Sequence, residues 1–231
     1  MLPTGKALGG APANFAYHAS RLGEEGWAVS AVGSDSLGRE ILSFLNGKKM
    51  RHIIAVTSKP TGTVEVTLNA NGDASYVINE DVAWDNIPFS PDMEILAKRA
   101  DAVCFGSLVQ RMASRDTVIR FLEAMRPDAL KVFDINLRQN YYTKEVLEES
   151  LRLADILKIN DQEMNVLVSL MGLPGFDIAA SEVQVVDTVG AGDSFTAAFV
   201  VAYLRGASLQ EAQRQASETA AFVCSRKGAM P

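Results

Sequence analysis

Apolar segments of strand length alternate with amphipathic segments of helix length through the middle of the chain. Three strand–helix pairs follow one another: 102–108 with 114–125, 131–136 with 144–154, and 155–160 with 161–171. Strands and helices that alternate in this way form right-handed βαβ units, which place the strands side by side in a parallel sheet. The pattern therefore predicts an α/β fold with a mainly parallel central sheet.

Polar side chains stand at the carboxyl ends of two of these predicted strands. Asp134 and Asn136 end the second strand, and Asn160 ends the third. Ligands of open α/β sheets bind outside the carboxyl ends of the strands, so these three residues mark the expected edge of a binding site.

One segment departs from this alternation. Residues 63–68 and 74–78 alternate in polarity and flank an Asn71-Gly72 pair, which is a strong signal for a β-hairpin. The hairpin, within about 57–80, is either a small β appendage that acts as a lid or an edge hairpin of the main sheet. The sequence leaves both readings open.

Composition narrows the class of protein. The 231 residues are 48% apolar and 22% charged, which suits one globular domain over 1–231. The net charge of −6 repels polyanions, so we expect no nucleic-acid partner. No apolar run reaches membrane-spanning length and the N-terminus lacks a signal-peptide core, so a cytoplasmic protein is expected. Cys104 and Cys224 lie in apolar stretches and are predicted to be buried free thiols.

The most informative stretch is 187–195, DTVGAGDSF, which follows a short apolar strand at 183–186 and precedes a predicted helix at 195–205. Gly190 and Gly192 let several backbone N–H groups converge at a helix N-terminus, which favours an anion. Asp193 lies in the first turn, where the helix dipole favours its ionised form. An anion cradle beside a carboxylate base is what phosphoryl transfer to an alcohol requires. The alternative is a glycine-rich turn whose Asp caps the helix.

This nine-residue stretch resembles the signature of the PfkB family of ribokinase-like carbohydrate kinases. The resemblance implies a three-layer α/β/α sandwich with a small β lid, and a kinase that uses ATP and Mg²⁺. It also implies that Gly190, Ala191 and Gly192 form the anion hole and that Asp193 is the catalytic base. No GxxxxGK[ST] motif of the other large class of kinases occurs.

A second family signature stands near the start, in the run GGAPAN at residues 9–14. By resemblance, Gly9, Gly10 and Asn14 hold the sugar, and an amide suits sugar hydroxyls because it offers both a donor and an acceptor. The alternative for Asn14 is a helix cap. His18, one turn further on, is expected to be a packing residue.

Three shorter matches accompany these two. The run GSDSLG at 33–38 resembles the family's GxDxxG turn, in which Asp35 is structural or lies near substrate. The run DINLR at 134–138 resembles the substrate-side strand end, and Arg138, with Asn136, is expected to bind the sugar or its phosphate. Asn160 and Glu163 match the NxxE motif that organises Mg²⁺ and nucleotide phosphates; alternatively, the acidic residues here only favour a helix N-terminus.

The resemblance extends to the hairpin and the C-terminus. Thr63, Glu65 or Tyr76 is expected to face the substrate from the lid. Residues 220–231 resemble the segment beside the adenine, which places Ser225 and Gly228 near nucleotide. A monovalent cation, K⁺, is expected near Asp187 and Gly228.

Two family segments are absent from the sequence. Relatives begin with a strand that carries a sugar-binding aspartate, which would precede residue 1, and they have several dozen more residues around 176–182. Either the printed sequence omits segments that the whole molecule has, or the polypeptide is truncated. Because truncation would expose sheet edges and apolar surface, we favour the first explanation.

The substrate prediction rests on the whole pattern. The run LGGAPANFAYHASRLG, the run FDINLRQNYY and the terminal RKGAMP resemble bacterial fructokinases most. We therefore expect ATP-dependent phosphorylation of a sugar primary hydroxyl, D-fructose to fructose 6-phosphate. The alternatives are another sugar or nucleoside, such as ribose or 2-keto-3-deoxygluconate, and a non-catalytic sugar- or nucleotide-binding regulator. A homodimer is an assembly that the sequence leaves open.

Overall fold

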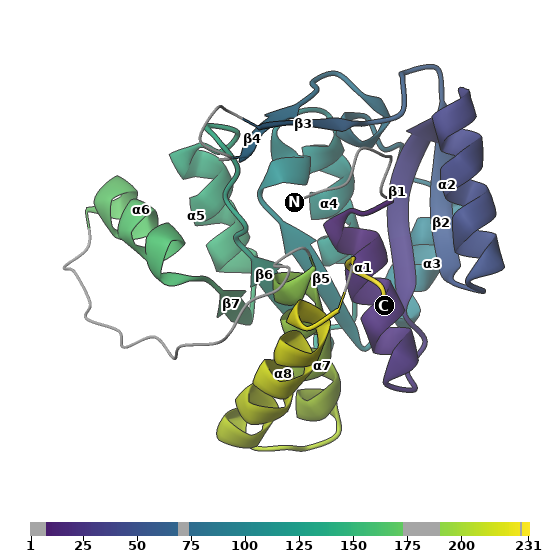
Figure 1. Cartoon of the computed structure of the whole chain (residues 1–231). Coiled ribbons are helices and arrows are strands. Elements are labelled where there is room, and N and C mark those ends of the chain that lie inside the picture. Colours follow the sequence, from purple (N-terminus) through teal and green to yellow (C-terminus); the bar gives the residue numbers. More distant parts are fainter. Residues whose placement is uncertain (1–7, 69–73, 173–189, 227) are drawn as a thin grey trace.

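Parallel strands in the middle of the molecule are covered by helices on both faces (Figure 1). The structure is a computed structural model and describes residues 8–68, 74–172, 190–226 and 228–231. In the described part, the strands form a two-stranded parallel sheet, β1 (Trp27–Gly33) with β2 (Arg51–Thr57), and a three-stranded parallel sheet in the order β5 (Ala102–Gly106), β6 (Leu130–Asp134), β7 (Ile156–Lys158).

The helices form one layer on each face. The first layer is α1 (Ala11–Arg21), α2 (Ser36–Gly47), α7 (Ala191–Leu204) and α8 (Leu209–Cys224). The second is α3 (Pro91–Arg99), α4 (Ser114–Ala124), α5 (Lys144–Leu153) and α6 (Asp161–Met171). The side chains of β1 point to the two faces of the sheet and so contact both layers. Ala28 packs into the cluster of α1 and α2, whereas Ala31 packs into the cluster of α3. The predicted three-layer α/β/α sandwich is confirmed.

The largest core lies between the three-stranded sheet and the second helix layer. Phe133 on β6 is fully buried and stacks on Phe105 of β5, with ring centroids 5.2 Å apart. Leu122 of α4 and Leu147 of α5 pack into the same cluster. This packing fixes β5 and β6 side by side, so that the loops after them emerge at one edge of the sheet.

The parallel strands of the predicted central sheet fall into two groups within the described ranges. Among the described residues, no strand joins β1 to β5, although α1 packs against both strands. In these ranges each of the two strands therefore keeps one edge that no described strand pairs. The expectation of two buried thiols is corrected for Cys104 of β5, which is only partly buried, whereas Cys224 is buried; both are free thiols.

The helix that follows the glycine-rich motif begins earlier than predicted. α7 is Ala191–Leu204, so the last five residues of the motif, 191–195, already lie in the helix that was predicted over 195–205. The strand predicted over 102–108 ends at Gly106, because Leu108–Gln110 forms a 3₁₀ turn, η2. The strand predicted at 183–186 and Asp187 lie outside the described residues.

The hairpin is a separate element. β3 (Val64–Leu68) pairs antiparallel with β4 (Ala74–Ile78) in a two-stranded sheet of its own, which decides for an appendage over an edge of the main sheet. Figure 1 shows it lying across the top of the molecule, and its turn lies outside the described residues. A second 3₁₀ turn, η1 (Ala83–Asp85), follows the hairpin.

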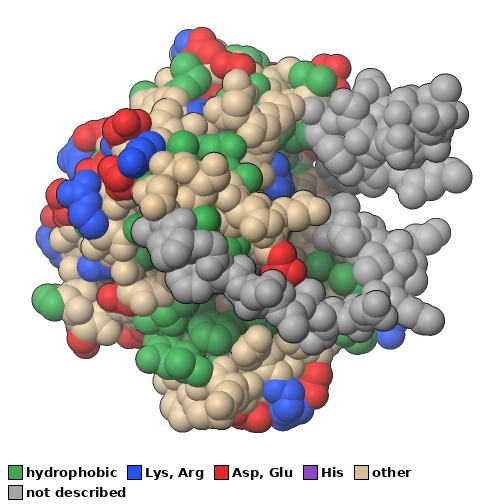
Figure 2. Space-filling model, turned by 90° about the vertical axis from the view of Figure 1, so that its left-hand side faces the viewer, with side chains coloured by type: hydrophobic (Ala, Val, Ile, Leu, Met, Phe, Trp, Pro, Cys, Tyr) green, Lys and Arg blue, Asp and Glu red, His purple; other side chains and the backbone are tan. Residues whose placement is uncertain are grey.

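Acidic and basic side chains are interspersed on the described surface in Figure 2. On this face, the described residues form no basic patch of the kind that binds nucleic acid.

Candidate active site

The glycine-rich motif builds an anion cradle at the start of α7. Gly190 is the N-cap and adopts a left-handed conformation with φ of 79°, which glycine reaches without strain. A Cβ at this position would also lie 2.5 Å from the Cβ of Ala229, so there is no room for a side chain. The backbone N–H groups of Ala191, Gly192 and Asp193 have no partner within the helix, as in any helix first turn. They are free to bind an anion.

Asp193 is held by a residue from the other family signature. Asn14, in α1, is 3% exposed, and its Nδ2 donates a hydrogen bond of 2.7 Å to Asp193 Oδ2. The contact joins two predicted site residues that are 179 positions apart in the chain. Asn14 Oδ1 is buried and has no partner among the described atoms. This oxygen is therefore a free acceptor beside the carboxylate, and a substrate hydroxyl can satisfy it.

A lysine that no sequence motif indicated completes the cluster. Lys158 is the last residue of β7, and its Nζ donates to Asp134 Oδ1 at 3.0 Å. A Cβ on Gly192 would lie 3.2 Å from the same Nζ, so this cation lies beside the anion cradle. The signal that could have identified Lys158 was its position near the carboxyl end of the strand predicted over 155–160, two residues before Asn160.

Asp134 is a buried counter-ion. Asp134 is 6% exposed, and its carboxylate also accepts a hydrogen bond of 3.3 Å from Thr196 Oγ1 of α7. Burial raises the pKa of Asp134, and the nearby Lys158 ammonium opposes this rise. The pair fixes the end of β6 against the end of β7 and orients the lysine toward α7.

Asn160 and Glu163 form a reciprocal cap at the start of α6. Asn160 Oδ1 accepts from Glu163 N at 2.9 Å, and Glu163 Oε2 accepts from Asn160 N at 3.1 Å. Glu163 Oε1 accepts from Leu137 N at 3.0 Å, which ties α6 to the loop that follows β6. A helix N-terminus that acidic residues favour is thus present at this position, and the role of Asn160 and Glu163 toward Mg²⁺ stays a prediction.

The other predicted sugar-side residues lie on loops at the same edge. Gly9 and Gly10 are exposed just before α1, and Asn136 is half-buried with a positive φ of 38°. Arg138 is exposed, and its Nη1 donates to the carbonyl of Leu137 at 3.1 Å. Within the described part of the chain, no hydrogen bond joins Arg138 to the Asp193 cluster.

The lid residues are placed only in part. Thr63 closes the base of the hairpin, because its Oγ1 accepts from Asn79 Nδ2 at 2.7 Å. Glu65 is exposed, and the side chain of Tyr76 lies outside the described residues. Asp35 is structural: it caps α2 through Gly38 N at 2.8 Å and accepts from Thr61 Oγ1 at 2.7 Å. Hydrogen bonds from Thr61 and Gly38 lower the pKa of Asp35 to about 2.

The C-terminal segment packs against α1 and the anion cradle. His18 Nε2 hydrogen-bonds the carbonyl oxygen of Ala229 at 2.8 Å, and Tyr17 Oη donates to Pro231 O at 2.6 Å. Ser225 caps α8 and donates to Phe222 O at 2.7 Å. Gly228, with φ of 80°, leads into the buried Ala229. His18 is thus a packing residue, as expected.

We expect the stability of the fold to depend on the protonation of His18. Burial lowers the pKa of His18 below 6.5, although the Ala229 carbonyl and the Asp193 carboxylate oppose this shift. The unfolded state binds the proton more readily, so this contribution is present above pH 6.5 and is lost as pH falls below it. Thermal unfolding should therefore show a steeper loss of Tm below pH 6.5 for the wild type than for His18→Gln. Parallel curves for the two proteins would contradict the assignment.

Two further features of the described residues concern metal binding and membranes. These residues contain no group of three or more His, Cys, Asp or Glu side chains that would hold a metal ion. No helix in the described ranges is long and apolar enough to span a bilayer.

Comparison with known proteins gives the family. The model described as "pfkB family carbohydrate kinase" matches residues 4–179 and 175–231. The chain belongs to the pfkB family of carbohydrate kinases. The fold predicted from its motifs is thereby confirmed as ribokinase-like, and the chain is a sugar or nucleoside kinase of an ATP-using family.

Named relatives of this pfkB kinase differ in substrate. The sugar kinase PH1459 of Pyrococcus horikoshii is 32% identical over 257 residues, covering 97% of this chain and 83% of that protein. The ribokinase of Bacillus subtilis is 30% identical over 249 residues (96% and 84% covered), and fructokinase-1 of Oryza sativa is 28% identical over 274 residues (98% and 85%).

The solved structures agree with the sequence match. The crystal structure of the uncharacterized sugar kinase PH1459 superposes with a TM-score of 0.84 at 30% identity, covering 98% of this chain and 85% of that chain. Its complex with ATP superposes with a TM-score of 0.82, covering 96% and 84%.

Proposed function

We propose that this pfkB kinase transfers the γ-phosphoryl group of ATP to the primary hydroxyl of D-fructose, giving ADP and fructose 6-phosphate. The observation that carries the proposal is the cluster at the start of α7. A carboxylate (Asp193), an amide with a free acceptor (Asn14) and a cation (Lys158) meet beside unpaired N–H groups.

Each member of the cluster has a distinct task in phosphoryl transfer. Asp193 accepts the proton of the attacking hydroxyl, and Asn14 orients that carboxylate through its Nδ2. The N–H groups of Ala191 and Gly192, with that of Gly190, stabilise the negative charge on the transferred group. Lys158 adds a positive charge on the same side, and Asp134 holds it there.

The sugar would be held by Asn14 and by the loops on either side of it. Asn14 Oδ1 accepts a hydrogen bond from a sugar hydroxyl, which would satisfy the one buried oxygen of Asn14 that has no partner. Gly9 and Gly10 let the backbone approach the sugar, and Asn136 and Arg138 bind it from the loop after β6. Fructose is supported by the resemblance of residues 8–23 to fructokinases and by the rice relative.

Mg²⁺ neutralises the phosphates when it is bound. The described residues offer no three-ligand cluster, so the ion would be held chiefly by nucleotide phosphates and water, near Asn160 and Glu163. Ser225 and Gly228 are proposed to lie near nucleotide, and K⁺ is proposed near Gly228 and Asp187. A cytoplasmic location and a homodimer belong to the same proposal.

The test is ADP release coupled to NADH oxidation, with Mg-ATP and K⁺, over fructose, ribose, 2-keto-3-deoxygluconate and nucleosides. We expect turnover with fructose to exceed that with each other acceptor by at least about tenfold, because polar pockets discriminate strongly between hydroxyl patterns. Preference for another acceptor would keep the mechanism and overturn the substrate. Calorimetric binding of fructose without turnover would favour the non-catalytic regulator.

A further inference from the structure

A buried arginine outside the phosphate cluster lies between two aromatic rings. The side chain of Arg111, just after η2, is 5% exposed, and its partner Asp85 is 0% exposed. Arg111 Nε donates to Asp85 Oδ1 at 2.7 Å and Nη2 to Asp85 Oδ2 at 2.8 Å. The guanidinium carbon lies 4.4 Å from the ring centroids of both Trp84 and Tyr141. We call Trp84, Arg111 and Tyr141 the aromatic clamp.

The clamp contacts the chain that leaves the hairpin. Arg111 Nη2 donates to the carbonyl of Asn79, the residue directly after β4, at 2.6 Å. Tyr141 Oη donates to Glu80 Oε1 at 2.9 Å and lies 3.3 Å from Ile78 O. The Tyr141 side chain and the Arg111 guanidinium therefore both hold residues 78–80 in place.

The chain that enters the hairpin contacts the clamp as well. A Cβ on Gly62, two residues before β3, would overlap Nε1 of Trp84, so the backbone passes directly against the indole. Asn79 then joins the two chains, because its N donates to Thr63 O at 3.3 Å and its amide donates to Thr63 Oγ1. The base of the hairpin is held on both sides by one stack of side chains.

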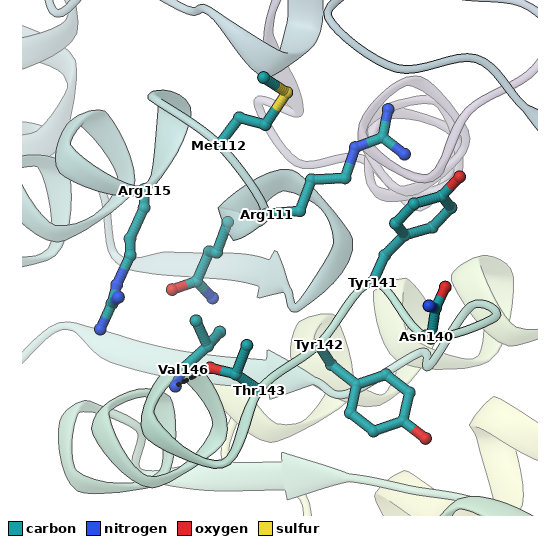
Figure 3. A pocket seen from close by; sticks show the side chains of 9 residues that line it. Arg111, Met112, Arg115, Asn140, Tyr141, Tyr142, Thr143 and Val146 are labelled. Carbon is teal, nitrogen blue, oxygen red and sulfur yellow. Dashed lines mark hydrogen bonds between the residues drawn. The ribbon is translucent and has the colours of Figure 1, made fainter.

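Tyr141 connects this stack to the sugar side. It lies on the loop after β6 that carries Asn136 and Arg138. In Figure 3 the Arg111 side chain runs toward Tyr141 and away from Arg115, and both arginines line a cavity of about 340 Å³. The contact between Arg111 and Tyr141 thus connects the base of the hairpin to the loop that carries Asn136 and Arg138.

Stability alone does not account for this arrangement. A buried ion pair adds little net stability compared with apolar residues of the same size, because both charges lose their hydration. The planar fork of arginine instead holds two partners at a set angle, which lysine cannot do. Here the two partners are Asp85 in the body and the Asn79 carbonyl at the hairpin.

We propose that Arg111 is a positioning residue of the kinase: through the aromatic clamp it sets the hairpin relative to the loop of Asn136 and Arg138, and so sets the affinity for the sugar. The inference rests on the proposed function. If the inference is right, substitution of Arg111 changes the affinity for the sugar and leaves the chemical step unchanged, because among the described residues the cluster of Asp193 and Lys158 does not contact the clamp.

The test compares Arg111→Lys with Arg115→Lys. The first keeps the charge opposite Asp85 but loses the fork; the second is the matched control, since Arg115 pairs with Glu149 at 2.6 Å and lines the same cavity without contacting the hairpin. We expect Arg111→Lys to raise KM for fructose by about tenfold or more, with KM for ATP and kcat within about threefold. Arg115→Lys should leave all three within about threefold.

A spectroscopic readout accompanies the kinetics. The chain has two tryptophans, so Trp27→Phe leaves Trp84 as the reporter. In that background, fructose should change the emission of Trp84, and Arg111→Lys should shift the titration midpoint by the same factor as KM. If Arg111→Lys does not fold, Tyr141→Phe removes only the bonds of Oη to the hairpin and should raise KM for fructose by a smaller factor.

Two results would overturn the proposal. One is equal kinetics in the two arginine variants, and the other is a fall in kcat of Arg111→Lys with KM for fructose unchanged. Failure of the proposed function is distinct, because the wild type itself would then turn over no fructose. In that case the same three variants are compared with whichever acceptor the panel identifies. If the panel identifies no acceptor, hydrogen exchange is measured at 64–68 and 77–80. Faster exchange in Arg111→Lys alone supports the clamp, and unchanged exchange in that variant refutes it.

Discussion

Asp193→Asn should lower kcat by about 10²–10⁴-fold with little change in fructose affinity. The amide keeps the size of the side chain and an oxygen that accepts from Asn14 Nδ2, but it does not take up the proton of the attacking hydroxyl. Binding of the sugar does not need that proton transfer, so KM or a calorimetric Kd should stay within a few fold. Steady-state kinetics with fructose and Mg-ATP measure kcat and KM, and calorimetric titration with fructose alone measures Kd.

The control for this variant is Asp92→Asn. Asp92 is also an acidic residue in a first helical turn, that of α3, and it is exposed. If only the favourable interaction of a carboxylate with the helix dipole mattered, the two substitutions would act alike, whereas a catalytic base predicts loss of kcat only at Asp193. A kcat near that of the wild type in Asp193→Asn would remove the base from the mechanism.

Lys158→Met should lower kcat/KM for ATP by about 10²–10³-fold, because it removes a fixed positive charge beside the cradle. It also leaves Asp134 buried without its counter-ion, and removal of one partner of a buried pair costs about 3–5 kcal/mol of the free energy of unfolding. Since burial already raises the pKa of Asp134, this loss should shrink as pH falls and the carboxyl becomes protonated.

The double variant Lys158→Met with Asp134→Asn separates the two effects. Neutralising the carboxyl removes the unpaired charge, so the double variant should regain most of the lost Tm. It should not regain ATP turnover, because the cation is still missing. A double variant with both wild-type Tm and wild-type kcat/KM for ATP would show that Lys158 serves the fold alone.

Local signals in the sequence predicted the individual elements well. The helix expected at 161–171 is α6 with the same bounds, because Asn160 and Glu163 form the capping box that marks its start. The hairpin was also predicted from its alternation. The start of α7 was placed too late, because glycines favour a turn, and only the left-handed Gly190 shows where that turn ends and the helix begins.

Long-range pairings could not be predicted in the same way. The motifs identified Asn14 and Asp193 separately, but their hydrogen bond depends on how α1 packs against α7. Lys158 and Asp134 are two charges at the ends of different strands, and only the parallel register of β6 and β7 places them in contact. Arg111 and Asp85 are both buried, and no local sequence signal indicates this.

The unpaired edges of β1 and β5 have a consequence for handling the protein. In the described part of the chain each strand offers a row of backbone donors and acceptors on the side that has no strand partner. Such rows are templates for pairing with any extended polypeptide, including a second molecule that is only partly folded. Wherever no further strand of the molecule covers these edges, association through them would grow with protein concentration. Keeping the protein dilute during refolding should therefore reduce such association.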